Sequence, residues 1–301
     1  MSKVYVFTEF GGPQHEQLID REPPQPGPGQ IAVEVRAAGV NPVDWKIREG
    51  MLGRSAQLPA PMGREAAGVV TAIGEGVSNF SVGDEVLGHP AAGMGAFAEH
   101  TLFKADTAHL KPEEVSFTDA ATIPVAGTTA YDTTHVGDLE AGATVLILGA
   151  GGGVGYMATQ ICAVHQFRVL AVASEAKREL LEAKGATFIA SDSAVAEAVA
   201  ELAPNGVDLI VDLVGGEALR AVAGAAVSPD RVVSAADPAT AKELGGQGRP
   251  TDPETLEKIT DVISYELVDP HVTAQYPLSQ AREALAAVES GHAEGKVVIV
   301  P

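Results

Sequence analysis

Apolar and polar residues alternate through residues 30–36 (QIAVEVR), as they do in a strand that buries one face. Other short apolar runs, separated by glycines or prolines, occur at residues 4–7, 68–73 and 84–88. Strands at this spacing, with turn-forming residues between them, predict a small barrel or sandwich over residues 1 to about 115.

From about residue 120 onward, short apolar runs alternate with longer segments of helical periodicity. Strands are predicted at residues 145–148, 168–173, 187–190, 207–213 and 231–235, and helices at 154–165, 175–184, 194–202 and 217–225. Such alternation is typical of βαβ units, which build a parallel sheet with helices on both faces. The predicted fold class is therefore α/β, with a doubly wound Rossmann sheet and a smaller β-rich domain. The last apolar run, residues 295–300, is expected to pair with the sheet of the first domain.

Composition narrows the class of protein. Of 301 residues, 46% are hydrophobic and 20% are charged, which allows a large core and argues against global disorder. The 40 acidic and 20 basic residues give a formal charge of −20, which argues against binding to nucleic acid or anionic membranes. No apolar run approaches the roughly 18 residues that span a bilayer. The first residues lack the pattern of a secretory signal, and Cys162 has no partner for an intramolecular disulfide, so we expect a cytoplasmic protein.

A glycine-rich turn, VLILGAGGGVG, follows the first strand of the second domain. In dinucleotide-binding folds, glycines at the positions of Gly149, Gly152 and Gly155 let the chain turn tightly and let a pyrophosphate approach the backbone. The helix that starts at Gly153 and Val154 would direct its N–H groups at that anion. The alternative is a tight turn with only a structural role. The position between a strand and a helix favours a cofactor site.

The end of the second strand of that domain indicates which dinucleotide would bind. An NAD site places an acidic residue there, about 20 residues on, to bind the ribose hydroxyls. This chain has Ser174 instead, followed by Lys177 and Arg178, which suit a 2′-phosphate and favour NADP. Glu175 argues the other way, since its charge would repel a phosphate. The alternative is that Ser174 caps the next helix and the two cations are solvated. A methyltransferase, the other candidate with this fold, would also require an acid at this strand end.

Seven segments together resemble the zinc-independent quinone oxidoreductases, the ζ-crystallin-like group of the medium-chain dehydrogenase/reductase superfamily. They are AGVNPVD (38–44), GREAAGVV (63–70), VGDEV (82–86), GAFAE (95–99), PVAGTTAY (124–131), the glycine turn and GKVV (295–298). The resemblance implies a GroES-like catalytic and substrate domain from residues 1–120 and 269–301, and a Rossmann NADP-binding domain from residues 121–268. It also implies an active site in the cleft between the domains and a homodimer.

Two departures from the zinc-dependent branch of that superfamily concern the metal. Asn41 and Arg64 stand where the resemblance places a cysteine and a histidine ligand, and neither can bind zinc in a tetrahedral site. Without a Lewis acid, alcohol oxidation loses its main mechanism. We therefore expect hydride transfer from NADPH to a quinone or an α,β-unsaturated carbonyl compound, whose developing negative charge a few hydrogen-bond donors can stabilise.

The segment after the third predicted strand holds the candidate catalytic residues. The resemblance places Asn41 at the reacting centre, where its amide would orient the substrate carbonyl or the nicotinamide ribose; the alternative is a turn asparagine before Pro42. Lys46 would reach the ribose, stabilise an enolate oxygen or supply a proton, or is simply solvated. We expect Asp44 to hold the loop by hydrogen bonds, and Trp45 to border the pocket or the core.

Four residues elsewhere have weaker assignments. Thr128 resembles the nicotinamide-contacting residue of the family, or caps the helix that it begins. Lys296 would reach a cofactor phosphate, or is an edge-strand lysine. Tyr131 is expected in the core, and Cys162 is expected to be a small buried apolar residue.

Two other functions compete with the reductase hypothesis. One is a non-catalytic NADPH-binding structural or regulatory protein of the crystallin kind, and the other is a zinc-dependent alcohol dehydrogenase. Loops 49–60 and 237–252 are expected to determine which acceptor binds.

Overall fold

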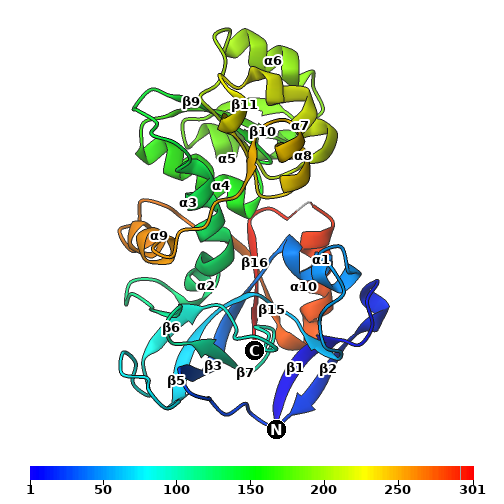
Figure 1. Cartoon of the computed structure of the whole chain (residues 1–301), viewed down its shortest axis with the longest axis vertical. Coiled ribbons are helices and arrows are strands. Elements are labelled where there is room, and N and C mark those ends of the chain that lie inside the picture. Colours follow the sequence, from blue (N-terminus) through cyan, green and yellow to red (C-terminus); the bar gives the residue numbers. More distant parts are fainter. Residues whose placement is uncertain (292) are drawn as a thin grey trace. The chain divides into compact units, whose positions relative to one another are not determined.

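The computed structural model describes residues 1–291 and 293–301. The chain divides into a first unit, Met1–Ala126 with His271–Pro301, and a second unit, Gly127–Pro270. The sequence predicts that the chain passes from one unit to the other after residues 120 and 268, close to the boundaries in the structure. Both chain ends belong to the first unit, which holds two sheets, and the second unit holds one sheet among the described residues (Figure 1).

Strand β3 (Gln30–Val40) organises the first unit. One edge pairs antiparallel with β5 (Glu65–Ile73) along its whole length. The other edge pairs with β7 (His100–Lys104) near its start and with β16 (Lys296–Val300) near its end. The sheet continues through β15 (Val272–Pro277), β6 (Glu85–Gly88) and β8 (His109–Leu110), and β1 (Ser2–Phe7), β2 (Glu16–Arg21) and β4 (Ala60–Pro61) form a separate small sheet. Alternation along β3 buries valine, isoleucine and alanine against the core, as the sequence pattern predicts.

Short helices connect and cover these strands. Helix α10 (Ala281–Glu289) packs on β15, β16 and α1 (Pro42–Glu49). The other helical segments of the unit are η1 (Pro13–His15), α2 (Phe117–Ala120) and η6 (Leu278–Gln280), and η2 (Ile123–Gly127) is a π-helical turn that leads into the second unit. Helices α1 and α10 have no counterpart among the elements that the sequence pattern predicts.

The described residues of the second unit form a parallel sheet in the order β11-β10-β9-β12-β13-β14. This is the 3-2-1-4-5-6 order of dinucleotide-binding folds. Its strands are β9 (Thr144–Leu148), β10 (Arg168–Ala173), β11 (Thr187–Ala190), β12 (Leu209–Asp212), β13 (Val232–Ser234) and β14 (Gln247–Gly248). Its helices are α3 (Thr128–Thr134), α4 (Gly153–Val164), η3 (Glu175–Lys177), α5 (Arg178–Glu182), α6 (Val195–Leu202), α7 (Gly216–Val222), η4 (Ala223–Ala225), η5 (Pro229–Arg231), α8 (Pro238–Glu243) and α9 (Thr255–Ser264).

The predicted fold class is confirmed. The predicted elements of the second unit differ from the structure mainly at their ends, whereas α8, α9 and β14 have no predicted counterpart. Strands β10 and β11 have the predicted bounds. The helix predicted at 175–184 is instead a 3₁₀ turn followed by α5, which ends before Gly185 with its left-handed backbone (φ +81°). None of the helices in the part of the chain that the structure describes is long and apolar enough to cross a bilayer.

Candidate functional site

Three strand ends bring polar residues together inside the first unit. Val297 of β16 pairs with Val40 of β3, so Lys296 lies beside Asn41, the residue that follows β3. On the opposite edge of β3, Gly39 pairs with Glu65, the first residue of β5. A side chain at Gly39 would collide with the Glu65 carboxylate, which explains the glycine in the segment AGVN.

Asn41, Glu65 and Lys296 form one hydrogen-bonded cluster, hereafter the Lys296 cluster. All three are buried, with 3%, 0% and 4% of their surfaces exposed. The Lys296 ammonium group donates to Asn41 Oδ1 (2.7 Å), Glu65 Oε1 (3.1 Å) and the Val40 carbonyl (3.2 Å). The Asn41 amide donates to Glu65 Oε1 (2.6 Å), and Glu65 Oε2 accepts the N–H of Val125 (2.7 Å). The single buried carboxylate is thus balanced by a single buried cation, as burial of charge requires.

Asp44 joins this cluster through the start of helix α1. Asn41 is the N-cap residue of α1, and the Asn41 N–H donates to Asp44 Oδ2 at 2.8 Å. This confirms the expectation that Asp44 holds the loop. The other oxygen, Asp44 Oδ1, is buried and has no hydrogen-bond partner among the described residues. Burial raises the pKa of Asp44 to about 7, and the nearby Glu65 charge adds to this rise, while the Asn41 N–H, Lys296 and Arg64 lower it.

The structure contradicts one of the sequence-based interpretations of Lys296 and leaves that of Asn41 untested. Asn41 is a helix cap with its amide engaged in the Lys296 cluster, so its predicted contact with substrate or ribose stays a prediction. Lys296 is not an edge-strand lysine, because β16 lies between β15 and β3. Its three acceptors occupy the three N–H donors of the ammonium group, so the geometry does not favour the predicted phosphate contact.

The donor set at this position does not fit a zinc ion. The Lys296 ammonium already supplies the positive charge beside Glu65, and Arg64 would repel a metal cation. Among residues 1–291 and 293–301, no three histidine, cysteine, aspartate or glutamate side chains are grouped so that they could hold a metal ion.

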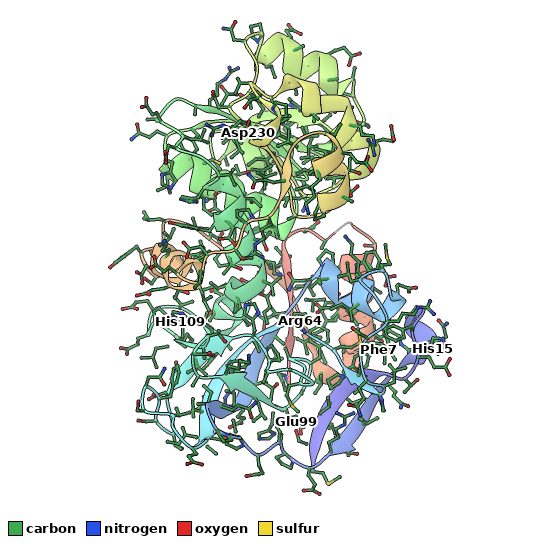
Figure 2. All side chains as sticks on the ribbon, in the orientation of Figure 1. Phe7, His15, Arg64, Glu99, His109 and Asp230 are labelled. Atoms are coloured by element: carbon green, nitrogen blue, oxygen red, sulfur yellow. The ribbon has the colours of Figure 1, made fainter. Side chains whose placement is uncertain are left out.

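A cavity of about 670 Å³ opens beside Asp44 within the first unit. Its wall is mostly the segment from Ser55 to Arg64, which includes the end of the loop expected to select the acceptor. The remaining lining residues are Phe7, Arg21, Asp44, Ile47, Ala92, Gly93 and Met94. Phe7 and Arg64 are labelled in Figure 2. Its volume lies within the range of small-molecule sites, and its lining is both polar and apolar.

The charged groups of the cavity differ in their partners. Arg21 donates to the Pro59 carbonyl at 3.1 Å. The guanidinium group of Arg64 is exposed and makes no hydrogen bond or ion pair with the described residues, while its carbonyl oxygen contacts His89 Nδ1. The cavity therefore offers one available cation and one buried carboxyl group.

Two other predicted residues of α1 do not line the cavity. Lys46 lies 5.9 Å from the ring centre of Trp45 and is half-buried, and it forms no hydrogen bond or ion pair with the described residues. Trp45 Nε1 is buried and has no partner in the same part of the chain. A catalytic role for Lys46 stays a prediction.

The glycine turn of the second unit has the geometry that a pyrophosphate site needs. Gly149 has a left-handed backbone (φ +81°), and a side chain at Gly155 would meet the backbone of Gly149 and Ala150. A side chain at Gly152 would meet only the Gly149 carbonyl, at 3.6 Å, so the space above the N-cap of α4 is open. Gly153 and Val154 begin α4, where backbone N–H groups have no partner within the helix. The turn therefore fits an anion.

After the end of β10 lie Lys177, whose charge suits a phosphate, and Glu175, whose charge is balanced by an ion pair with Arg178. A side chain at Gly151 would meet Lys177 Cγ, so Lys177 lies against the glycine turn. Arg178 forms ion pairs with Glu175 (2.6 Å) and Glu182 (3.2 Å). The hydrogen bond from Arg178 lowers the pKa of Glu175. Arg178 is thus engaged, and the charge of Glu175, which argued against NADP, is balanced by it. Ser174 is the N-cap of η3, but its side chain makes no capping hydrogen bond.

Sequence reasoning missed Arg249, which organises the residues around Thr128. The Arg249 guanidinium donates to Thr128 Oγ1 (2.8 Å), Thr129 Oγ1 (2.6 Å) and Asp132 Oδ2 (2.8 Å). Thr128 is the first residue of α3, and its hydroxyl accepts from Arg249. No local pattern could have revealed this contact, because 121 positions separate Thr128 from Arg249.

The last two residues considered in the sequence, Cys162 and Tyr131, contact other side chains or the core. Cys162 is fully buried, so the prediction of a small buried apolar residue is confirmed, and burial raises the pKa of its thiol to about 12. Tyr131 is only half-buried, and its ring stacks on His135 with 3.8 Å between centroids.

Known families and structures match both units. Residues 27–113 match the alcohol dehydrogenase GroES-like domain, and residues 184–299 match the zinc-binding dehydrogenase family. A 2-methylene-furan-3-one reductase of Solanum lycopersicum is 32% identical over 99% of this chain and 79% of its own length. The quinone oxidoreductase structure from Coxiella burnetii has a TM-score of 0.90 at 27% identity, and the match covers 100% of this chain and 99% of that one.

A further relative is longer than this chain. The synaptic vesicle membrane protein VAT-1 homolog of Rattus norvegicus is 38% identical over 71% of this chain, and this match spans 54% of the relative, about half its length. Fold, sheet order and sequence matches together show that the chain belongs to the medium-chain dehydrogenase/reductase superfamily. Within that superfamily it belongs to the zinc-independent quinone oxidoreductase group, as the sequence resemblance implied.

Proposed function

We propose that this protein is an NADPH-dependent reductase of quinones or α,β-unsaturated carbonyl compounds. The observation that carries the proposal is the open glycine turn between β9 and α4, with Lys177 against it and no unpaired acid at the end of β10. Relatives named as a quinone oxidoreductase and as a 2-methylene-furan-3-one reductase support this class of acceptor.

The nicotinamide, when bound, supplies the hydride. The residues of this chain would bind and orient the cofactor. The N–H groups at the start of α4 would bind the pyrophosphate, Lys177 and Ser174 the 2′-phosphate, and Thr128 the nicotinamide end. Arg249 would hold the hydroxyl of Thr128 in one orientation.

The cavity of the first unit is the proposed site of the acceptor. Its volume of about 670 Å³ is sufficient for a single-ring quinone or an enone. Arg64 at this cavity would stabilise negative charge on the acceptor oxygen during reduction. By resemblance alone, we also expect a homodimer in the cytoplasm, which analytical ultracentrifugation and cell fractionation would test.

Cofactor binding is tested at two positions with matched controls. We expect Gly152→Leu to weaken NADPH binding at least tenfold, because the side chain would fill the space for the pyrophosphate without a steric clash. Gly224→Leu is the control, since it also has open space around it but lies outside the turn. Lys177→Ala should weaken NADPH more than NADH, whereas Lys184→Ala should change neither. Equal loss for both cofactors would exclude a 2′-phosphate role for Lys177.

Turnover is tested by following NADPH absorbance with a panel of quinones and enones. Oxidation of NADPH that depends on the acceptor would support the reductase proposal. Tight NADPH binding without turnover on any acceptor would instead favour a non-catalytic NADPH-binding protein.

A further inference from the structure

Two histidines of the second unit meet at the C-terminal ends of neighbouring helices. His135 is the C-cap residue of α3 and His165 is the C-cap residue of α4, and these two helices pack on each other. The Nε2 atoms of the two rings are 3.1 Å apart. We propose that these residues, hereafter the histidine pair, bind a divalent cation that prefers imidazole ligands, such as Zn²⁺ or Cu²⁺, and that the ion ties the ends of α3 and α4 together.

The backbone determines which nitrogen of His135 carries the free lone pair. His135 Nδ1 lies 2.7 Å from the Tyr131 carbonyl oxygen, which can only accept, so Nδ1 is the donor. In the neutral ring, Nε2 then has the lone pair that a metal ion needs. Metal-bound histidines usually donate their other ring N–H in this way, because the contact fixes the tautomer and the direction of the ring. Stacking on Tyr131, with 3.8 Å between ring centroids, supports the same orientation.

The spacing of the histidine pair fits two ligands of one ion. For metal–nitrogen bonds of about 2.0–2.1 Å, a separation of 3.1 Å between the Nε2 atoms corresponds to an N–metal–N angle of about 100°. This angle lies between the right angle of square-planar sites and the tetrahedral angle. The ring planes cross at 82°, so the rings do not stack face to face.

A hydrogen bond from His165 Nε2 to His135 Nε2 is the alternative explanation of this spacing. No contact among the described residues requires it, because His165 Nδ1 has no partner there and can carry the proton instead. Both residues are exposed, so water would weaken such a hydrogen bond. The same exposure lets water supply the remaining ligands of a bound ion.

The charged groups near the histidine pair have partners of their own. Besides the partner ring, Asp132 and Lys258 are the side chains whose charges act on His135. Asp132 accepts hydrogen bonds from Arg249 and Thr255, so it is not available as a third ligand. Lys258 on α9 forms ion pairs with two carboxylates, which balance its charge. The C-terminal end of α4 carries a partial negative charge, which favours a cation at this place.

The test is Zn²⁺ binding to the chelator-treated full chain, measured by isothermal titration calorimetry. His165→Gln keeps an N–H that can donate to His135 Nε2, but an amide does not replace imidazole as a zinc ligand. We expect His165→Gln and His135→Gln each to weaken Zn²⁺ binding by at least about tenfold, since losing even a group that only orients a ligand usually costs this much. Bound Cu²⁺ should show hyperfine coupling to two imidazole nitrogens in the electron paramagnetic resonance spectrum of the wild type, and to at most one in either variant.

His109→Gln is the matched control. His109 lies on β8 of the first unit, and its half-buried ring forms no hydrogen bond or ion pair with the described residues. This variant should bind Zn²⁺ as the wild type does. An equal loss of affinity in His109→Gln and His165→Gln would mean that ions bind to imidazoles all over the surface, and it would contradict the proposal. If His165→Gln binds Zn²⁺ as tightly as the wild type, the two rings share only a hydrogen bond and the inference is wrong.

Heat denaturation gives a second measurement. An ion that binds the folded chain raises Tm as its concentration increases. Zn²⁺ should therefore raise the Tm of the wild type and of His109→Gln more than that of His165→Gln, whereas Mg²⁺, which takes oxygen ligands, should not distinguish the three proteins. The same Zn²⁺ shift in all three would overturn the inference. Neither measurement uses NADPH or an acceptor, so the outcome is independent of the proposed reductase function.

Discussion

Two buried cations of the first unit, Arg48 and Lys296, stand in contrasting surroundings. Arg48 is fully buried and donates to Glu16 (2.5 Å), Glu49 (2.8 Å), Glu289 (3.0 Å) and the Gly11 carbonyl (3.0 Å). These contacts, hereafter the Arg48 cluster, join α1 to β2 and α10. Lys296 has an acceptor for each of its three N–H donors, but one oxygen of the neighbouring Asp44 has no hydrogen-bond partner among the described residues.

Comparing the two clusters shows how far the burial and pairing of a charge can identify a functional site. Burial and ion pairing are common to both clusters, so neither identifies a site. The Arg48 cluster has satisfied its buried side-chain atoms among the described residues and does not border the cavity. The Lys296 cluster lies next to Asp44, which lines that cavity and has one buried oxygen without a hydrogen-bond partner among the described residues. Trp45 Nε1 also lacks a partner there and does not line the cavity, so a missing hydrogen bond by itself does not identify a ligand site either.

The largest expected effect is on stability, from Arg48→Met. The substitution leaves the buried Glu16 carboxylate without its main cation, and breaking a buried pair in this way typically costs about 3–5 kcal/mol. Urea denaturation would measure the loss. Arg36→Met is the control, since the Arg36 side chain is 47% exposed and pairs with Glu34 at 3.4 Å; its cost should stay below about 1 kcal/mol.

The activity of the same Arg48→Met variant tests whether the Arg48 cluster affects the cavity. Arg48→Met protein that remains folded should keep the wild-type pH profile, because Arg48 does not contact the cavity. If the dependence of kcat/KM on pH changed in this variant, the two clusters would be coupled, and Arg48 would not have the purely structural role assigned to it.

The next effect is a pH dependence of stability that belongs to Asp44. Its folded pKa of about 7 exceeds the ordinary aspartate value, so between about pH 4 and 7 the folded state holds a proton that the unfolded chain has lost. The resulting stabilisation is complete at low pH and is lost as the pH rises through 7. We expect wild-type stability, relative to Asp44→Asn, to fall by at most about 1.4 kcal/mol per pH unit in this window. Denaturation at pH 5 and pH 8 would measure it, and a constant difference would contradict the raised pKa.

The sequence contained most of the information about the second unit and only part of that about the first. In the second unit, strand and helix signals are local: the apolar run at β9 and the glycines after it define the turn, whatever the rest of the chain does. The start of α1 is not among the predicted elements, although its signal is local: Asn41 and Asp44 are spaced as a capping box with a proline at the first helical position.

The Lys296 cluster could not be predicted because its members meet only through strand pairing. Lys296 and Asn41 are 255 positions apart, and a shift of one residue between β16 and β3 would turn the side chain to the other face. The same holds for Arg48, which sequence patterns would place on the exposed face of a helix. Its burial depends on Glu289, 241 positions away.

The smallest expected effect comes from Tyr5→Phe, and it tests whether the Arg48 cluster has only a structural role. The Tyr5 hydroxyl donates to Glu16 Oε2 at 2.8 Å, and burial followed by this hydrogen bond raises the pKa of Tyr5, so it stays protonated at every pH where the protein would be assayed. Removing the hydroxyl should cost about 1–2 kcal/mol and the cost should be equal at pH 6 and pH 9, unlike that of Asp44→Asn. Because Tyr5 and Arg48 share Glu16, the double variant should differ from the sum of the single variants by more than about 0.5 kcal/mol in urea denaturation. Strict additivity, or a pH-dependent cost, would show that Glu16 is not the shared buried acceptor on which the contrast with Asp44 depends.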